Sequence, residues 1–256
     1  MAKEDLYKRS TLTYSLIALC VAIFVLEVIY GLQYGSLGSD RFGDAVQNLF
    51  NNFGFSFQNL LGGKVWTLVS SVFLHVDSQH LLLNMLALFF FGRVVEMSLG
   101  RKKFLLVFIS SAVVGNLAFL AFSLLSGSTA TLVIGASGAI FGLMGTAMLA
   151  RPLELVFYPY LIPVPLILVA VLYTLYNIGS FLLVATSLES SDISYAAHIG
   201  GLAAGMLFGF REERSKKGFL ILLFLLAVLL LTPFLWIIFQ YLDVFNYTST
   251  LSSFLK

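Results

Sequence analysis

The feature that most constrains the fold of this chain is a series of apolar stretches that are long enough to cross a lipid bilayer. A transmembrane helix needs about 20 consecutive, mainly apolar residues. Such stretches occupy residues 14–32, 80–99, 104–125, 132–150, 165–185, 194–210 and 219–242. With 59% hydrophobic and 11% charged residues in 256, the chain is more apolar than a soluble domain can bury. Lipid offers no partner for open backbone groups, so the sequence predicts an all-α, polytopic membrane bundle of about seven transmembrane helices.

Basic residues are concentrated on one side of this alternation of spans. That side holds Lys3, Lys8, Arg9, Arg101, Lys102, Lys103, Arg151, Arg211, Arg214, Lys216 and Lys217, and the other holds Arg41, Lys64 and Lys256. Cytoplasmic loops are enriched in Lys and Arg, so we expect a cytoplasmic N-terminus and an external C-terminus. The second, fourth and sixth spans then run inward from the outer side. The basic residues are accounted for by topology, and no basic cluster indicates a nucleic-acid partner.

The longest outer loop, residues 35–64, carries many phenylalanine and leucine residues among polar ones. It either lies in the membrane interface or folds as an ordinary outer loop with its own small core, and the sequence leaves both alternatives open. Cys20 is the only cysteine and lies within the first span, so no internal disulfide can form.

The first stretch with chemical interest is G-A-S-G-A-I-F-G, residues 135–142, which opens the fourth span. Gly138 and Gly142 form a G-x-x-x-G motif, which lets two helix backbones approach closely. A serine in such a motif, here Ser137, commonly hydrogen-bonds to its own helix or to a neighbour. Taken alone, the stretch therefore fits helix packing as well as catalysis.

Two further stretches place histidines near the outer ends of spans. His198 opens the sixth span, followed by Gly201 and Gly205, which again form a close-packing face. His80 and Asn84 lie four residues apart at the start of the second span, on one helical face. Ionisable residues inside a membrane are costly and usually functional, although each could simply hydrogen-bond at a helix crossing.

These residues are predicted to lie at a common depth in the membrane. The second, fourth and sixth spans all start outside, so Ser137, His198, His80 and Asn84 lie one to two turns inward, roughly 6 to 10 Å at 1.5 Å per residue. Glycine faces on the fourth and sixth helices would allow a serine–histidine hydrogen bond. A nucleophile, a base and two donors at one level form a hydrolytic site.

Three motifs together, G-A-S-G-A-I-F-G, A-H-I-G-G-L-A-A-G and F-L-H-V-D-S-Q-H-L-L-L-N, resemble the rhomboid family of intramembrane serine proteases over about residues 64–210. The resemblance implies that Ser137 is the nucleophile and His198 the general base. It also implies that His80 and Asn84, with the backbone N–H of Ser137, stabilise the oxyanion.

The resemblance extends to residues around this site. Those in a supporting role are Phe141, placed against the histidine ring, and the glycines Gly135, Gly138, Gly201 and Gly205. Glu96, Gly100 and Arg101 match a structural E-x-x-x-G-R pattern that closes the second span, whereas Thr67 follows Trp66 where the family usually has arginine. The implied organisation is a cytoplasmic segment at 1–13, a six-helix core at 14–212, and an added transmembrane helix with an external tail at 213–256.

The implied reaction is cleavage of another protein's transmembrane helix near its outer end through an acyl-enzyme. A serine hydroxyl is a weak nucleophile, so His198 must accept its proton during attack. Asp192 lies too far before His198 to serve as a third member, so we expect a dyad whose imidazole is held by packing. The substrate helix must unwind, which favours small or helix-breaking residues at the cleavage site.

Two other functions are compatible with the spans. A rhomboid-like pseudoprotease would bind membrane proteins without cutting them but would be expected to lack the serine or the histidine. A transporter would show paired broken helices and polar groups at mid-membrane. Glu27 in the first span is the feature that most favours the transporter, although we expect it to pair within the bundle.

No cofactor or metal is expected, because His75, His80 and His198 lack the carboxylate or cysteine neighbours of a zinc site. The expected partners are transmembrane protein substrates and the lipid bilayer. The sequence does not indicate an oligomeric state.

Overall fold

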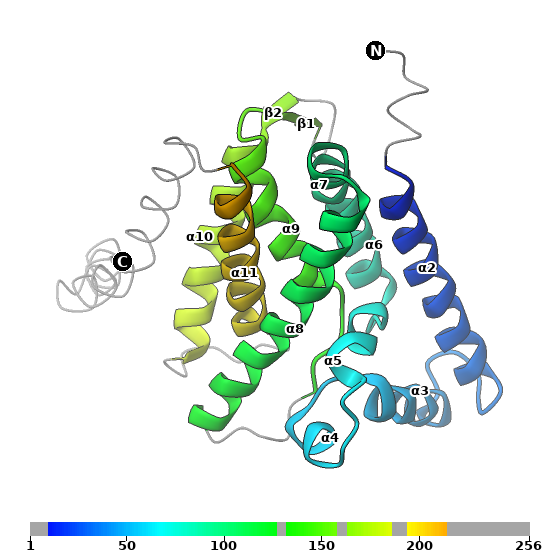
Figure 1. The fold of residues 1–256 in the computed structure, drawn as a ribbon. Coiled ribbons are helices and arrows are strands. Elements are labelled where there is room, and N and C mark those ends of the chain that lie inside the picture. Colours follow the sequence, from blue (N-terminus) through cyan, green and yellow to red (C-terminus); the bar gives the residue numbers. More distant parts are fainter. Residues whose placement is uncertain (1–9, 127–131, 158–162, 186–193, 214–256) are drawn as a thin grey trace, which may run out of the picture.

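The computed structural model describes residues 10–126, 132–157, 163–185 and 194–213 (Figure 1). The predicted span at 219–242, the external tail and Asp192 lie outside the described residues. The elements are α2 (Thr11–Leu32), α3 (Asp40–Phe53), α4 (Phe57–Leu61), α5 (Thr67–Ser70), the 3₁₀ helix η1 (Ser71–Phe73), α6 (Ser78–Ala87), the π-helix η2 (Leu88–Gly92), α7 (Arg93–Leu99), α8 (Arg101–Ser126), α9 (Ser137–Ala150), β1 (Leu155–Phe157), β2 (Pro163–Pro165), α10 (Leu166–Ala185) and α11 (Tyr195–Glu213).

Several of these helices have the dimensions of membrane spans. The helices Thr11–Leu32, Ser78–Leu99 and Arg101–Leu125 are long and apolar enough to cross a bilayer, and Ser137–Ala150 and Leu166–Phe181 are shorter apolar helices. The prediction of a helical, multi-pass integral membrane protein is therefore confirmed. A short antiparallel pair, β1–β2, which the sequence did not predict, interrupts the helical pattern.

The fourth predicted span begins later than expected. Residues 132–136 are not helical, because Val133 pairs with Phe55 through two backbone hydrogen bonds of 2.9 and 2.8 Å. The N–H of Gly135 then donates to the carbonyl of Ser71 at 2.9 Å. Gly135 has φ +114°, a conformation that side-chain-bearing residues rarely adopt. The helix consequently starts at Ser137, and the prediction of helix from residue 132 is wrong.

The centre of the bundle is α9, whose residues 139–150 are all buried. A helix that is apolar on all sides is expected at such a position. It packs against α8 and α11 (Figure 1). A Cβ at Gly201 would clash with the carbonyl of Gly138, and one at Gly205 would clash with that of Gly142. The glycines therefore let α9 and α11 cross at backbone contact, as the G-x-x-x-G pattern predicted.

The first helix is anchored to the bundle through Glu96. The carboxylate of Glu96 accepts hydrogen bonds from the backbone N–H groups of Leu12 at 2.9 Å and Thr13 at 2.8 Å, and from the Thr13 hydroxyl at 2.7 Å. The first N–H groups of a helix lack partners within the helix, so this buried acid caps α2 from a distant part of the sequence. The E-x-x-x-G-R pattern thus includes a residue that orients the first span.

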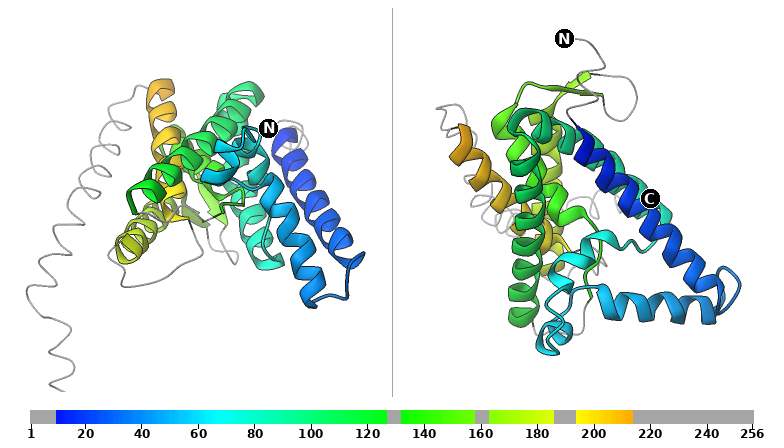
Figure 2. Two further views of the ribbon diagram at one scale, coloured as in Figure 1. Left: turned by 90° about the horizontal axis from the view of Figure 1, so that it is seen from below. Right: turned by 45° about the vertical axis from the view of Figure 1, so that its right-hand side comes forward.

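The loop at residues 35–64, which the sequence predicted on the outer side, is folded and packs beside α2. In α3 the side chains of Ala45 and Phe50 are buried, and Figure 2 shows α2 and α3 together at one side of the molecule, away from α10 and α11. The indole N–H of Trp66 donates to the carbonyl of Asn52 at 3.2 Å, and the Lys64 ammonium donates to the side-chain oxygen of Asn52 at 2.9 Å. These bonds tie the end of the loop to α3 without the arginine that is usual in the family.

Candidate active site

The structure brings Ser137 and His198 into hydrogen-bond contact. Ser137 is the first residue of α9 and His198 lies in the first turn of α11. The Oγ of Ser137 and the Nε2 of His198 are 2.7 Å apart. The close crossing of α9 and α11 positions the pair, and only 8% of His198 is exposed. A hydroxyl in contact with a ring nitrogen has the geometry needed for proton transfer during nucleophilic attack.

Asn177 on α10 holds the other ring nitrogen of His198. Its side-chain oxygen lies 2.6 Å from Nδ1, while its side-chain NH₂ donates to the carbonyl of Tyr173 at 2.9 Å. Because the amide nitrogen of Asn177 donates to a carbonyl, the side-chain oxygen of Asn177 is the atom that faces the imidazole. This oxygen can only accept, so the proton of the hydrogen bond is on Nδ1 of His198. Nε2 is then left with a lone pair that can accept the Ser137 proton.

Asn177 was not predicted from the sequence, because a third member was expected to be acidic. Packing holds the imidazole through the Phe141 ring, and the Asn177 hydrogen bond is a second restraint that the sequence did not predict. The available signal was an amide inside an otherwise apolar span, where a polar side chain is costly and needs a partner.

Aromatic rings pack on two sides of the imidazole. Phe141 stacks on His198 with ring centroids 4.4 Å apart and an interplanar angle of 12°. Tyr195 meets the ring edge-on at 6.1 Å and 89°. These contacts and the Asn177 hydrogen bond together restrict rotation of the His198 side chain.

His80 and Asn84 lie beside the backbone that leads into Ser137. A Cβ at Gly135 would be 2.8 Å from the Nε2 of His80 and 3.7 Å from the side-chain nitrogen of Asn84. That nitrogen is buried and has no hydrogen-bond partner among the described residues. Ser137 opens a helix, so its own N–H has no acceptor within α9. The side chains of His80 and Asn84 are thus gathered beside Gly135, two residues before the serine.

His75, which the sequence analysis interpreted as a loop residue, is fully buried beside His80. Its ring meets the His80 ring at 5.2 Å, and its Nδ1 lies 3.3 Å from the carbonyl of Phe73. Burial lowers the pKa of His75 to about 4, with repulsion from His80 in the same direction and attraction to Asp77 opposing it. His75 is therefore a neutral ring at pH 7.

Taken together, these features define a buried serine–histidine site with nearby donors, set at helix ends within an apolar bundle. Residues 62–215, more than half of the chain, match the Rhomboid domain family. The chain therefore belongs to the rhomboid family, and the resemblance noted in its motifs is confirmed.

Relatives in this family include proteins that are named as proteases. The chain is 29% identical over 186 residues to RHOMBOID-like protein 12, mitochondrial, of Arabidopsis thaliana, an overlap of 68% of this chain and 54% of that protein. It is 32% identical over 158 residues to the putative rhomboid protease YdcA of Bacillus subtilis, covering 60% and 71%. With the rhomboid protease GlpG of Haemophilus influenzae it shares 26% identity over 216 residues, covering 84% and 97%. The chain thus spans about half of the Arabidopsis relative and nearly all of the Haemophilus one.

Proposed function

We propose that this chain is an intramembrane serine endopeptidase that cleaves transmembrane helices of other membrane proteins near their outer ends. The observation that carries the proposal is the 2.7 Å contact between Ser137 Oγ and His198 Nε2. Membership of a family whose relatives are named rhomboid proteases supports the same conclusion.

In the proposed reaction Ser137 is the nucleophile and His198 the general base. As Ser137 Oγ bonds to the scissile carbonyl carbon, its proton passes to His198 Nε2. The imidazolium is stabilised by the Nδ1–H bond to Asn177, which makes Asn177 a positioning residue. The proton then moves to the departing amine as the peptide bond breaks and the acyl-enzyme forms. Water activated by His198 hydrolyses that ester and restores the serine.

We assign oxyanion stabilisation to His80, Asn84 and the backbone N–H of Ser137. Their proximity to Gly135 and the unpartnered amide nitrogen of Asn84 support this assignment. A preorganised donor of this kind typically contributes about 2.7 to 4 kcal/mol to the transition state. The donors need no reorganisation during the reaction, because α6 and the turn before α9 fix them.

We further propose seven spans with a cytoplasmic N-terminus, a core at residues 14–212 and an added helix with an external tail at 213–256. The distribution of Lys and Arg supports this orientation. In this arrangement Ser137 and His198 face the outer side. A substrate helix has to expose a carbonyl there, so small or helix-breaking residues favour cleavage.

The proposal is tested by incubating purified protein in detergent with a model transmembrane substrate. Native protein should produce two fragments, and Ser137→Ala and His198→Ala should produce none. A matched control is Ser110→Ala, which removes a hydroxyl from α8 that donates to the carbonyl of Val107. Equal cleavage by the native and Ser137→Ala proteins would refute the assignment of the nucleophile.

A further inference from the structure

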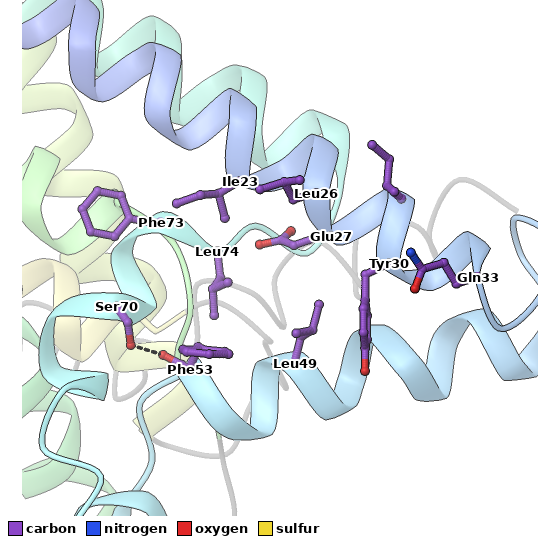
Figure 3. Close-up of a pocket in the computed structure, with 11 residues that line it drawn as sticks. Ile23, Leu26, Glu27, Tyr30, Gln33, Leu49, Phe53, Ser70, Phe73 and Leu74 are labelled. Carbon is purple, nitrogen blue, oxygen red and sulfur yellow. Dashed lines mark hydrogen bonds between the residues drawn. The ribbon is translucent and has the colours of Figure 1, made fainter.

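A cavity lies away from Ser137 and His198, in the angle between α2, α3 and the segment formed by α5 and η1 (Figure 3). Its volume is about 490 Å³, within the range of small-molecule pockets. Its walls are mainly apolar and include Leu26 from α2, Leu49 and Phe53 from α3, and Phe73 and Leu74 from the end of η1.

The cavity contains one acidic group, the carboxylate of Glu27. Glu27 is 4% exposed, and neither carboxylate oxygen has a hydrogen-bond partner among the described residues. The expectation that it pairs within the bundle is therefore wrong for the part of the chain that the structure describes. The backbone amide of His75 interacts with the carboxylate but makes no hydrogen bond of normal geometry. A buried, unpaired carboxylate is costly, and a donor from outside the chain would offset that cost.

The nearby hydroxyls do not supply this donor. The hydroxyl of Ser70 donates to the carbonyl of Phe53 at 2.7 Å, and the hydroxyl of Tyr30 accepts from that of Tyr34 at 3.3 Å, while neither bonds to Glu27. Among the described residues no group of three or more His, Cys, Asp or Glu side chains could hold a metal ion at Glu27. An external partner for Glu27 would therefore need its own N–H or O–H donors.

The surroundings of the cavity indicate the rest of that molecule. On α2, the side chains of Leu26 and Ile29 line the cavity and are exposed, as expected for a helix that faces lipid chains. A ligand that reaches Glu27 from this side passes apolar walls before it meets a single acid. An alkyl chain fits the walls, and a primary ammonium fits the acid because it supplies both a positive charge and three N–H donors.

We propose that this cavity binds a long-chain primary amine, with its ammonium donating to Glu27 and its chain lying against Leu26 and Leu49. The ammonium belongs either to the head group of an aminophospholipid or to a free alkylamine. The site is built from α2, α3 and η1 and does not use the candidate active-site residues, so it stands whether or not the chain is a protease.

The test is photolabelling of the full-length protein in a neutral detergent with a dodecylamine that carries a diazirine at its far end. Labelled peptides identified by mass spectrometry should come from α2 and α3. Glu27→Gln should weaken labelling about 10-fold or more, the loss of one charge-assisted hydrogen bond. Glu154→Gln, which removes an exposed carboxylate near β1, should leave it unchanged.

Competition distinguishes the possible sources of the amine and the importance of its donors. Unlabelled dodecylamine or lysophosphatidylethanolamine should displace the probe, and the stronger of the two identifies the source. Dodecanol and dodecyltrimethylammonium, which lacks N–H donors, should compete poorly. Leu49→Trp, which fills the apolar part while keeping Glu27, should also reduce labelling. Equal labelling of native protein and Glu27→Gln, or equal competition by all four compounds, would overturn the proposal.

Discussion

Replacing Asn177 with leucine tests whether its hydrogen bond to Nδ1 of His198 contributes to catalysis. The substitution removes the oxygen that lies 2.6 Å from His198 Nδ1 while keeping a side chain of similar size. A hydrogen bond to a group that becomes charged contributes about 1.5 to 3 kcal/mol. Because the imidazolium forms only during the reaction, the loss should fall on kcat, about 10- to 150-fold, with KM little changed.

The assay is cleavage of a transmembrane substrate in proteoliposomes, with kcat and KM measured separately. Thr174→Val is the matched control, since it removes a buried polar group from α10 that donates to the carbonyl of Ala170 within its own helix. Asn177→Asp should restore much of kcat and shift the rise of the pH–rate profile to higher pH, because a charged acceptor stabilises the imidazolium. An unchanged kcat for Asn177→Leu in an active native background would refute the role of Asn177 and leave the proposed function intact.

Three further predictions concern the neighbouring groups. Asn84→Ala should lower kcat about 10²- to 10³-fold, measured in the same assay, as expected for the loss of one oxyanion donor. Gly135→Ala should abolish cleavage, because its φ is +114° and its Cβ would lie 2.8 Å from Nε2 of His80, whereas Gly179→Ala, with open space around it, should not. The pKa of His75 is lowered from 6.5 to about 4, so the unfolded state binds more protons between these values and stability should fall by about 3 kcal/mol as pH drops from 6.5 to 4. Thermal unfolding in detergent should show this loss, reduced in His75→Phe; an equal loss in both proteins would contradict it.

Much of the fold could be predicted because bilayer thickness fixes the length of each apolar span. The alternation of inward- and outward-running spans predicted that Ser137 and His198 lie at the same depth. The structure joins the two residues through a hydrogen bond. The start of α9 could not be predicted, because hydropathy does not distinguish helix from apolar extended chain. Residues 132–136 are apolar enough for a span, but the pairing of Val133 with Phe55 keeps this segment extended.

The environments of two polar side chains within spans also escaped prediction. Asn177 and Glu27 both stand alone in apolar sequence, and nothing in that pattern tells which one meets a partner. Asn177 is paired because α10 packs beside α11 and brings it to His198. Glu27 has no hydrogen-bond partner among the described residues, because it lines a cavity between α2 and α3. Both outcomes depend on the packing of helices, which spacing along the chain does not specify.

The most direct measurement for the central claim is covalent labelling of the purified protein by a fluorophosphonate, with the modified residue mapped by mass spectrometry. A fluorophosphonate reacts with a serine whose proton is taken up by a neighbouring base. Label should appear on Ser137, be lost in His198→Ala and persist in Ser111→Ala, which lacks another buried hydroxyl of the same bundle. Folded native protein that takes up no label at Ser137, or His198→Ala labelled as fast as native, would contradict the account.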